Sequence, residues 1–237
     1  PLRRQRQMSI TDMLIKNKNV FKNIFSLKSK EYDNFSWGYN FNWQSRAFYV
    51  PQDTPTIVNT SFICHGLLDL YLLNNDKNLL KIVSSSCKFI LNDLNRYEDG
   101  NQICFSYTPI DNIRVHNANI LGAGLIARYS EIKNINTFDS HILKCYNYLA
   151  DHQNSNGSWY YAETNYQNWI DSFHTAFNLF SLEHIYSHFQ NKKEILKTIK
   201  SGKNFYINNF FRKDGSPKYY HDRIYPIDIH SSSMALA

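Results

Sequence analysis

Hydrophobic residues recur along the chain with the spacing of an α-helix. Between positions 79 and 94 they fall three or four residues apart, as expected for one buried helix face, at Leu79, Leu80, Val83, Cys87, Ile90, Leu91 and Leu94. Segment 87–94 (CKFILNDL) aligns with 145–152 (CYNYLADH) and 203–210 (KNFYINNF), at a spacing of 58 residues each. We therefore expect related helices at these three places.

A second set of segments keeps a similar period. Residues 59–71, 116–129 and 174–186 each begin with Asn or His and end on a tyrosine. Asp or Asn precedes a glycine at positions 100, 157 and 215, which are 57 and 58 residues apart. Glycine at such a turn accepts the positive φ that a helix end requires. The repeating unit is thus predicted to be a loop followed by a helical hairpin.

Internal repeats of this length determine the architecture. Helical hairpins either stack into an open solenoid or close into a ring, and units with a long loop before the hairpin resemble those of (α/α) toroids, whose loops gather at one mouth. We expect an all-α fold in which residues 1–30 form a basic leader with a lone helix at about 9–29. A partial (α/α) toroid follows at 31–237, with repeats at about 31–95, 96–153, 154–210 and 211–237. A closed ring of this type holds more hairpins than these, so we expect the toroid to be incomplete.

The composition is that of a folded protein. Hydrophobic residues make up 43% of the chain and charged residues 19%, which excludes global disorder. No uninterrupted apolar run reaches the ~18 residues of a membrane-spanning helix, so no transmembrane segment is expected. The net charge of +6 arises in residues 1–30, where eight basic side chains accompany one acid. Because the rest of the chain is close to neutral, we do not expect a nucleic acid as partner.

The sequence contains no strong metal or redox motif. The cysteines lack C-x-x-C spacing and have apolar neighbours, so we expect free buried thiols at Cys64, Cys87, Cys104 and Cys145. His184 and His188 are four residues apart without the H-E-x-x-H glutamate, which indicates a helix surface or interface. We expect no metal and no cofactor. No signal peptide is visible, which indicates a cytoplasmic protein, or a periplasmic one if a signal peptide precedes these residues.

The loops before the first helix of each hairpin hold most of the unusual residues. Aromatic rings alternate there with polar side chains, as in WGYNFNWQSR (37–46), QNWIDSFH (167–174) and KYYHDRIYPIDIH (218–230). Flat rings cover the apolar faces of sugars while polar groups meet hydroxyls, although the same rings could instead pack hairpin against hairpin. We predict substrate binding by Trp37, Tyr39, Trp43, Gln44, Arg46, Asn59, His116, Trp159, Tyr160, Trp169, Tyr219, Tyr220 and Arg223.

Polar residues at the predicted N-terminal ends of the first helices form a column of Asn59, His116, His174 and His230. Helix N-termini attract anions, so this mouth would favour a ligand such as a uronate. The candidate acids and bases are Asp171, His174, Asp222, Asp228 and His230. For Asp171 and Asp228, helix capping is at least as good an explanation as catalysis. A pair of carboxylates would hydrolyse a glycosidic bond, whereas His or Tyr beside Arg would abstract a proton next to a carboxylate.

Residues 153–159, QNSNGSW, match a known toroid motif. The pattern Q-x-x-x-G-x-W resembles that of terpene-cyclase and prenyltransferase toroids, where it ties consecutive hairpins together. The resemblance implies a ring of hairpins. It does not extend to chemistry, because the D-x-D-D and D-D-x-x-D acids of the cyclases are absent and the Asp/Cys/His zinc set of protein prenyltransferases is not recognisable.

A closer resemblance covers residues 36–237. The segments WGYNFNWQSR, TPTIVNTSF, NGSWYY, QNWIDSFHTAFNL and DGSPKYYHDRIYPIDIHSS resemble a bacterial family found with capsule and exopolysaccharide biosynthesis genes. That family resembles six-hairpin glycosidases and, distantly, the helical domain of glucuronyl C5-epimerases. The resemblance implies a glycan-processing protein of surface polysaccharide production, a glycosidase, lyase or uronate epimerase whose partner is an oligo- or polysaccharide.

Two other functions stay open. One is a non-catalytic carbohydrate-binding or scaffold toroid, and the other is a toroid for an isoprenoid-linked substrate. Two carboxylates about 5–10 Å apart in a pocket would favour hydrolysis. A Tyr/His/Arg cluster without such a pair would favour lyase or epimerase chemistry, and a dry aromatic cavity without a polar floor would favour an isoprenoid.

Overall fold

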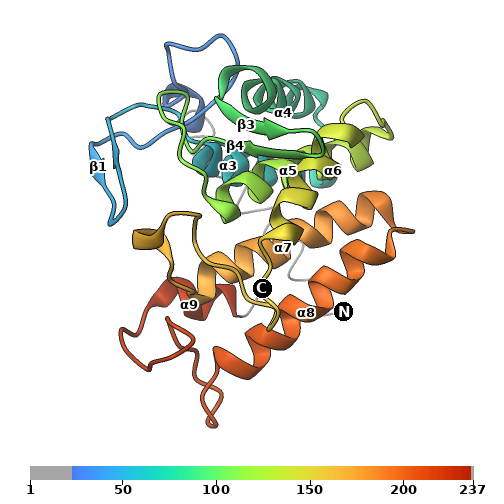
Figure 1. Cartoon of the computed structure of the whole chain (residues 1–237). Helices are drawn as coiled ribbons and strands as arrows, with labels where there is room; N and C mark the ends of the chain where they lie inside the picture. Colours follow the sequence, from blue (N-terminus) through green and yellow to red (C-terminus); the bar gives the residue numbers. More distant parts are fainter. Residues whose placement is uncertain (1–22, 236–237) are drawn as a thin grey trace, which may run out of the picture.

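The computed structural model describes residues 23–235 and is built mainly of helices (Figure 1). Within these residues, helical hairpins follow one another as α3 (Ile57–Asn74) with α4 (Lys77–Lys88), α5 (His116–Lys133) with α6 (Asp139–Asp151), and α7 (Ser172–Phe189) with α8 (Lys193–Asn209). The short helix α9 (Ile229–Met234) follows. The predicted all-α fold with repeated hairpins is confirmed.

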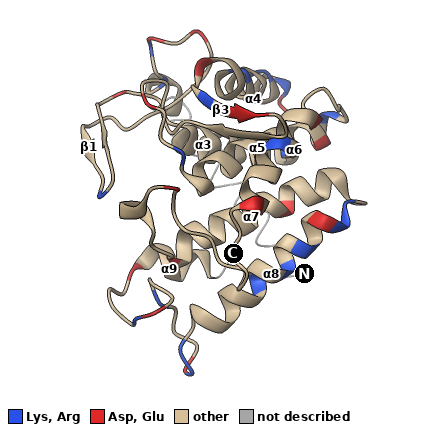
Figure 2. Ribbon diagram, viewed as in Figure 1, with Lys and Arg blue, Asp and Glu red and all other residues tan. Residues whose placement is uncertain are grey.

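The first and second helices of the hairpins differ in how they are buried. Helix α5 packs against both α3 and α7 and is buried at nearly every position from His116 to Tyr129. The second helices bury one face, which in α8 comprises Ile195, Thr198, Ile199, Gly202, Phe205 and Tyr206. The lysines of α8, blue in Figure 2, are exposed. The first helices therefore form an inner row, and the second helices cover it.

Glycine allows helices α5 and α7 of this row to pack closely. A Cβ added at Gly124 of α5 would lie 2.9 Å from the Cβ of Ser181 in α7, which is closer than side chains normally approach. The predicted Asx-Gly turns also have the expected backbone, with φ of 47° at Gly100, 92° at Gly157 and 82° at Gly215. Each of these glycines makes a turn in which other residues would be strained, between two strands at 100 and after a helix at 157 and 215.

Short strands interrupt the helical repeat. Antiparallel β3 (Arg96–Asp99) and β4 (Gln102–Phe105) form a hairpin around the Gly100 turn, and β1 (Trp43–Gln44) pairs with β2 (Tyr49–Val50). A single 3₁₀ turn, η2 (Asn165–Gln167), lies before α7. The helix predicted through residue 94 instead changes at Lys88 into a π-helical segment, η1 (Phe89–Asp93).

Two further expectations concern the leader and the thiols. The lone helix predicted at 9–29 lies largely outside the described residues. Within the described part of that range, residues 23–26 are helical. All four cysteines are free and buried, as predicted. None of the helices between residues 23 and 235 combines the length and apolar character that crossing a bilayer would require.

Candidate functional site

A cavity of about 620 Å³ opens at the N-terminal ends of α3, α5 and α7. Its walls come from the β1–β2 hairpin and from the loops before α7 and α9, which lie on the left of Figure 1. The structure brings together there nine residues predicted from the sequence, Tyr39, Trp43, Arg46, Asn59, Trp169, His174, Tyr219, Tyr220 and His230. Loops far apart in the chain thus meet at one mouth.

Aromatic rings form much of the cavity wall. The Trp43 ring lies 4.9 Å from that of Tyr39 and stacks on Tyr107 at 6.1 Å between centroids. In the loop before α7, Tyr161 and Trp169 stack at 4.4 Å with 12° between their planes. Rings arranged in this way can cover the apolar face of a sugar.

Asp171 and His174 form the most defined polar pair at the cavity. Asp171 caps α7, because its Oδ1 accepts the backbone N–H of His174 at 2.9 Å. Its Oδ2 lies 2.6 Å from Nδ1 of His174 and accepts the indole N–H of Trp169 at 2.8 Å. Asp171 is only 1% exposed, while His174 lines the cavity. With Nδ1–H held by the carboxylate, Nε2 of neutral His174 can accept a proton.

His230 is the second histidine of the cavity. It lies in α9, with Nδ1 3.3 Å from Oδ1 of Asp228, whose other oxygen caps that helix through Ser231 at 3.0 Å. The ring of Phe173 contacts both histidines, at 4.0 Å from His174 and 6.0 Å from His230 between centroids. Two imidazoles therefore flank one aromatic ring at the mouth.

Arg46 crosses from the β1–β2 hairpin to the loops of later repeats. Its guanidinium lies 4.6 Å from the ring centre of Trp169, and its Nη1 donates to the hydroxyl of Tyr220 at 3.2 Å. Both partners are neutral, so the charge of Arg46 is held by an aromatic face and a phenol. A cation is thereby placed on the cavity wall.

Two asparagines add polar groups to the floor. Asn59 accepts the hydroxyl of Thr56 at 2.9 Å through Oδ1. Within residues 23–235 its amide N–H groups make no hydrogen bond, so they can bind a ligand. Asn117, which the sequence did not single out, also lines the cavity and is 3% exposed. Its Oδ1 has no hydrogen-bond partner among residues 23–235. The floor is therefore polar, unlike a wholly apolar isoprenoid tunnel.

Several tyrosines at the cavity are held neutral. Burial raises the pKa of Tyr161 and Tyr107 well above the ordinary value, and burial followed by the charge of Asp171 raises the pKa of Tyr219. Their hydroxyls are therefore neutral hydrogen-bonding groups near pH 7. Neither Asp nor Glu is among the described residues that line this cavity.

The predicted acids have other positions. Asp171 lies behind His174 and caps α7, Asp228 caps α9, and Asp222 is exposed and pairs with Arg223 at 3.2 Å. None of the three lines the cavity. The expectation that these carboxylates face one cavity as a hydrolytic pair is therefore corrected, because capping directs two of them to backbone amides.

Trp37 and Trp159 are core residues and not subsite residues. They are 1% and 2% exposed, and each indole N–H donates to a backbone carbonyl, of Ile24 at 2.8 Å and Leu149 at 3.0 Å. Their size and buried hydrogen bonds fix the loops on which cavity residues stand. The prediction that they bind substrate is corrected.

Gln44, Tyr160 and Arg223 also lie outside the cavity lining. The amide of Gln44 donates to the carbonyl of Ser45 at 2.9 Å, and Tyr160 is partly exposed beside the buried Tyr161. The Arg223 guanidinium covers the outer part of Tyr220, 4.4 Å from the ring centre. These three support the walls or face solvent.

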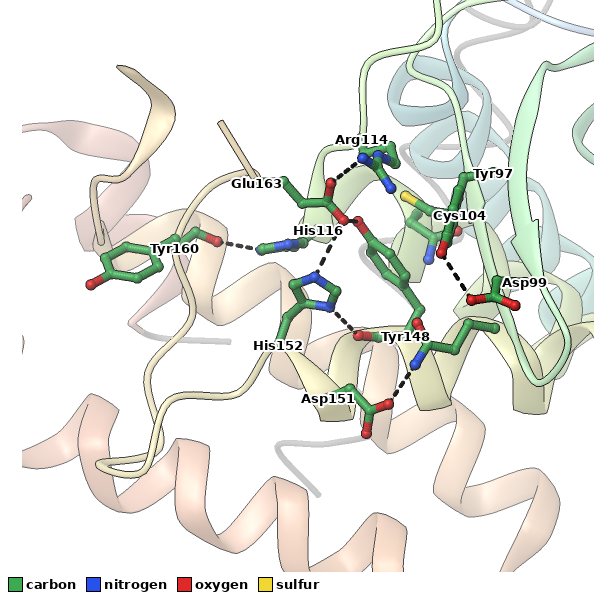
Figure 3. A network of polar contacts seen from close by, with 12 residues as sticks. Tyr97, Asp99, Cys104, Arg114, His116, Tyr148, Asp151, His152, Tyr160 and Glu163 are labelled. Carbon is green, nitrogen blue, oxygen red and sulfur yellow. Dashed lines mark hydrogen bonds and ion pairs between the residues drawn. The ribbon is translucent and has the colours of Figure 1, made fainter. Parts of the chain in front are cut away.

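His116 does not line the cavity and belongs to a separate polar network (Figure 3). Its Nδ1–H donates to the carbonyl of Tyr160 at 2.8 Å, and its ring lies 4.8 Å from that of His152. Burial lowers the pKa of His116 to about 4. The predicted column of four residues is therefore wrong at this position, where Asn117 reaches the cavity instead.

Glu163 is the centre of that network. It accepts from Arg114 at 2.6 Å, lies 3.2 Å from Nε2 of His152 and accepts the hydroxyl of Tyr148. Figure 3 shows these side chains converging between the loop that follows Trp159 and helices α5 and α6. The network holds the loop that carries Tyr161 and Trp169, so it positions one wall of the cavity.

No cluster of three or more His, Cys, Asp or Glu residues suited to a metal occurs within residues 23–235. His184 stacks on His65 at 5.0 Å, and Nε2 of His188 lies 2.7 Å from Asp139. Both histidines thus lie in contacts between helices, as the sequence indicated.

Sequence reasoning missed the other residues that line the cavity. They are mostly aliphatic or aromatic residues of the first helices and their loops, namely Ser45, Ala47, Val58, Phe62, Ile63, Tyr107, Asn117, Tyr161, Phe173 and Phe177. Several are sequence neighbours of residues that were predicted. Phe62 and Phe177 carried a usable signal, since each lies three residues after a predicted cavity residue, Asn59 in α3 and His174 in α7, and so on the same helix face.

Comparisons with known proteins bear on the fold. Neither protein-family models nor curated protein sequences gave a match. Among solved structures, a GH76 α-mannanase from Bacteroides thetaiotaomicron is similar with a TM-score of 0.70 and 13% identity, over 90% of this chain and 60% of that one. A cellobiose 2-epimerase from Spirochaeta thermophila is similar with a TM-score of 0.67 and 12% identity, over 92% and 61%.

A polysaccharide lyase is similar with a TM-score of 0.56 and 9% identity, over 76% of this chain and 58% of that one. This chain thus spans about 60% of the length of the mannanase and the epimerase. At identities this low the likeness shows the fold and leaves the reaction open. The repeated hairpins of this chain have the arrangement of (α/α)-toroid enzymes.

Proposed function

We propose that the protein processes a glycan by moving a proton to and from a sugar carbon, as an epimerase or a lyase does. One observation carries this proposal, the pair of Asp171 and His174 at a cavity whose described lining contains no carboxylate. An imidazole oriented by a buried carboxylate is suited to act as a general base. Aromatic walls and amide groups around it are suited to hold a sugar.

In this proposal, some cavity residues bind the sugar and others transfer the proton. Trp43 and Trp169 cover the faces of the sugar, and Asn59 binds hydroxyls. Nε2 of His174 removes a proton from a carbon next to a carbonyl or carboxyl group, and Asp171 stabilises the imidazolium that forms. His230 is the second proton carrier, because it lines the same cavity and has Asp228 beside Nδ1.

Hydrolysis fits this cavity less well. Glycosidases use two carboxylates that flank the scissile bond, one as acid and the other as base or nucleophile. Asp171 is committed to His174, Trp169 and the α7 amide, which leaves no carboxylate of the described residues to serve a glycosidic oxygen. An isoprenoid substrate fits less well too, because Arg46 and the asparagines would be buried against hydrocarbon.

The structural neighbours support a carbohydrate substrate. Their names describe a mannanase, an epimerase of cellobiose and a lyase of polysaccharides. The resemblance of segments 37–46 and 214–232 to a capsule-associated family supports, more narrowly, a role in bacterial surface polysaccharide production. We propose that role for this chain.

Solvent isotope exchange tests the proposal. The protein is incubated in D₂O with neutral and acidic oligosaccharides, and mass spectrometry and NMR follow deuterium at ring carbons, inversion, and unsaturated products. Deuterium incorporation that depends on His174 is the expected result. Binding without exchange, cleavage or inversion would overturn the enzyme proposal and leave a carbohydrate-binding toroid. Chain cleavage without deuterium incorporation would instead indicate hydrolysis.

A further inference from the structure

Arg46 is unlike the other arginines that the structure describes. Five of the six have a carboxylate partner, namely Arg96 with Glu98, Arg114 with Glu163, Arg128 with Asp69, Arg212 with Asp214, and Arg223 with Asp222. Arg46 has none within 4.0 Å among residues 23–235, and it is the one that lines the cavity. A guanidinium kept on a cavity wall beside neutral partners is available to bind an anion.

The rest of the lining is compatible with an anion. Asn59 has its carbonyl oxygen occupied by Thr56, so the groups it can offer a ligand are N–H donors. His174 and His230 become cationic when they take a proton. No carboxylate of the described chain lines the cavity, and the nearby Asp171 and Asp228 are paired with His174 and His230. Charge and hydrogen-bonding groups therefore point to the same ligand class.

A chain of side-chain contacts connects Arg46 to the proposed base, His174. Its guanidinium lies on Trp169, the Trp169 indole donates to Asp171, and Asp171 holds His174. The Tyr161 ring, stacked on Trp169, contacts the ring of His174 at 4.6 Å. An anionic group bound by Arg46 would thus lie on the wall that carries the base.

We propose that the cavity takes an acidic sugar, a uronate residue of a glycan, and that Arg46 binds its carboxylate. This inference rests on the proposed function and names its substrate class. Neutralising the carboxylate makes the hydrogen on the adjoining carbon more acidic. That chemistry explains why a cation and a base belong on one wall.

The proton transfer balances without a cofactor. Nε2 of His174 takes the proton from the carbon bearing the carboxylate, and the C–H electron pair moves into the carboxylate to give an enolate facing Arg46. In an epimerisation the carbon regains a proton on its other face from His230, which enters the step as an imidazolium, and proton exchange with water then returns both histidines to their starting forms. In an elimination the pair forms a C=C bond, and the oxygen substituent on the next carbon leaves with a proton from His230.

Binding experiments separate charge from shape. The probes are trigalacturonate, its methyl ester, and a neutral trisaccharide carrying one sulfate, each titrated by calorimetry. The free acid is expected to bind at least about tenfold more tightly than the ester, because a charge-assisted hydrogen bond is replaced by a neutral one. Arg46→Gln should abolish the preference, Arg46→Lys should keep part of it, and Arg212→Gln, at an exposed ion pair, should leave it unchanged.

Equal binding of acid and ester, or equal weakening of both by Arg46→Gln, would overturn the inference. Equal binding of the sulfated sugar and the uronate would show an anion site without selection of a carboxylate, and would overturn it as well. The outcome for the proposed function is separate. Arg46-dependent uronate binding without deuterium exchange would leave this inference standing and refute the enzyme. Deuterium exchange on neutral sugars that is unaffected by Arg46→Gln would support the proposed function and overturn the uronate inference.

Discussion

Asp171 both caps helix α7 and holds the ring of His174. One carboxylate oxygen accepts the backbone N–H of His174 at 2.9 Å, and the other lies 2.6 Å from Nδ1 of the same residue. The helix start therefore fixes the position of the ring as well as that of the backbone. Capping and catalysis, which looked like alternatives in the sequence, are compatible in one side chain.

Replacing Asp171 with Asn should separate these two roles. The amide oxygen can still cap α7, so the free energy of unfolding should fall by only about 1 kcal/mol. The amide N–H₂ would face Nδ1 of His174 and favour the tautomer with the proton on Nε2, which cannot act as base. Deuterium exchange should therefore fall by about 10²-fold or more, while the dissociation constant for sugar changes little.

Asp76→Asn provides the matched control. Asp76 caps α4 by accepting from Asn78 at 2.9 Å, and it lies away from the cavity lining. It should lose a similar amount of stability and keep the full exchange rate. If Asp171→Asn kept its rate, or lost activity only in proportion to unfolding, Asp171 would be a helix cap alone.

Trp169→Phe should weaken catalysis more than binding. Phenylalanine keeps a ring against Tyr161 and a face for Arg46, but it cannot donate to Asp171. Loss of this charge-assisted hydrogen bond is expected to reduce exchange by about tenfold, while calorimetry should find sugar affinity within about twofold. Trp169→Ala, which also removes the ring, should weaken binding. Equal effects of both substitutions would indicate that the ring alone matters.

The hairpins could be predicted because their signals are local. A helix buries a stripe at every third or fourth residue, and that stripe recurs in 79–94, 145–152 and 203–210. Turn glycines at 100, 157 and 215 marked the ends of the units, and all three have positive φ. The change from α4 to a π-helical segment at Phe89 left no such signal, since it depends on how α4 meets its neighbours.

The sequence predicted the loops around the cavity, but only some of the individual residues that line it. Adjacent helix positions differ by about 100° in direction, so a one-residue offset turns a side chain from the mouth to the core. Asn117 and not His116 reaches the cavity for this reason. In the loop before α7, Tyr161 lines the cavity and the predicted Tyr160 does not. Which neighbour points inward is set by backbone pairing between loops, such as Val115 with Ala162, which periodicity does not encode.

Gly202→Ala should destabilise the protein although alanine favours helices. A Cβ at position 202 of α8 would lie 2.6 Å from the buried ring of Trp159 and 2.9 Å from Leu179. Overpacking of this kind costs about 1–3 kcal/mol, which exceeds the gain in helix propensity. Gly66→Ala in α3, with no atom within 4 Å of the added carbon, should instead stabilise by up to about 1 kcal/mol. Denaturant unfolding measures the change in the free energy of unfolding for both variants. Changes of the same sign would contradict this packing.

Stability should fall as the pH drops from about 6.5 to about 4, the pKa to which burial lowers His116. Because an unfolded histidine keeps its ordinary pKa, the unfolded chain binds more protons in this window and is stabilised relative to the folded one. His116 alone should cost up to about 3 kcal/mol, and the lowered pKa values of His65 and His184 act in the same direction. Urea unfolding across this range measures the slope. His116→Phe, which can keep ring contacts with Tyr148, should make it shallower, and an unchanged slope would show that His116 is not the group responsible.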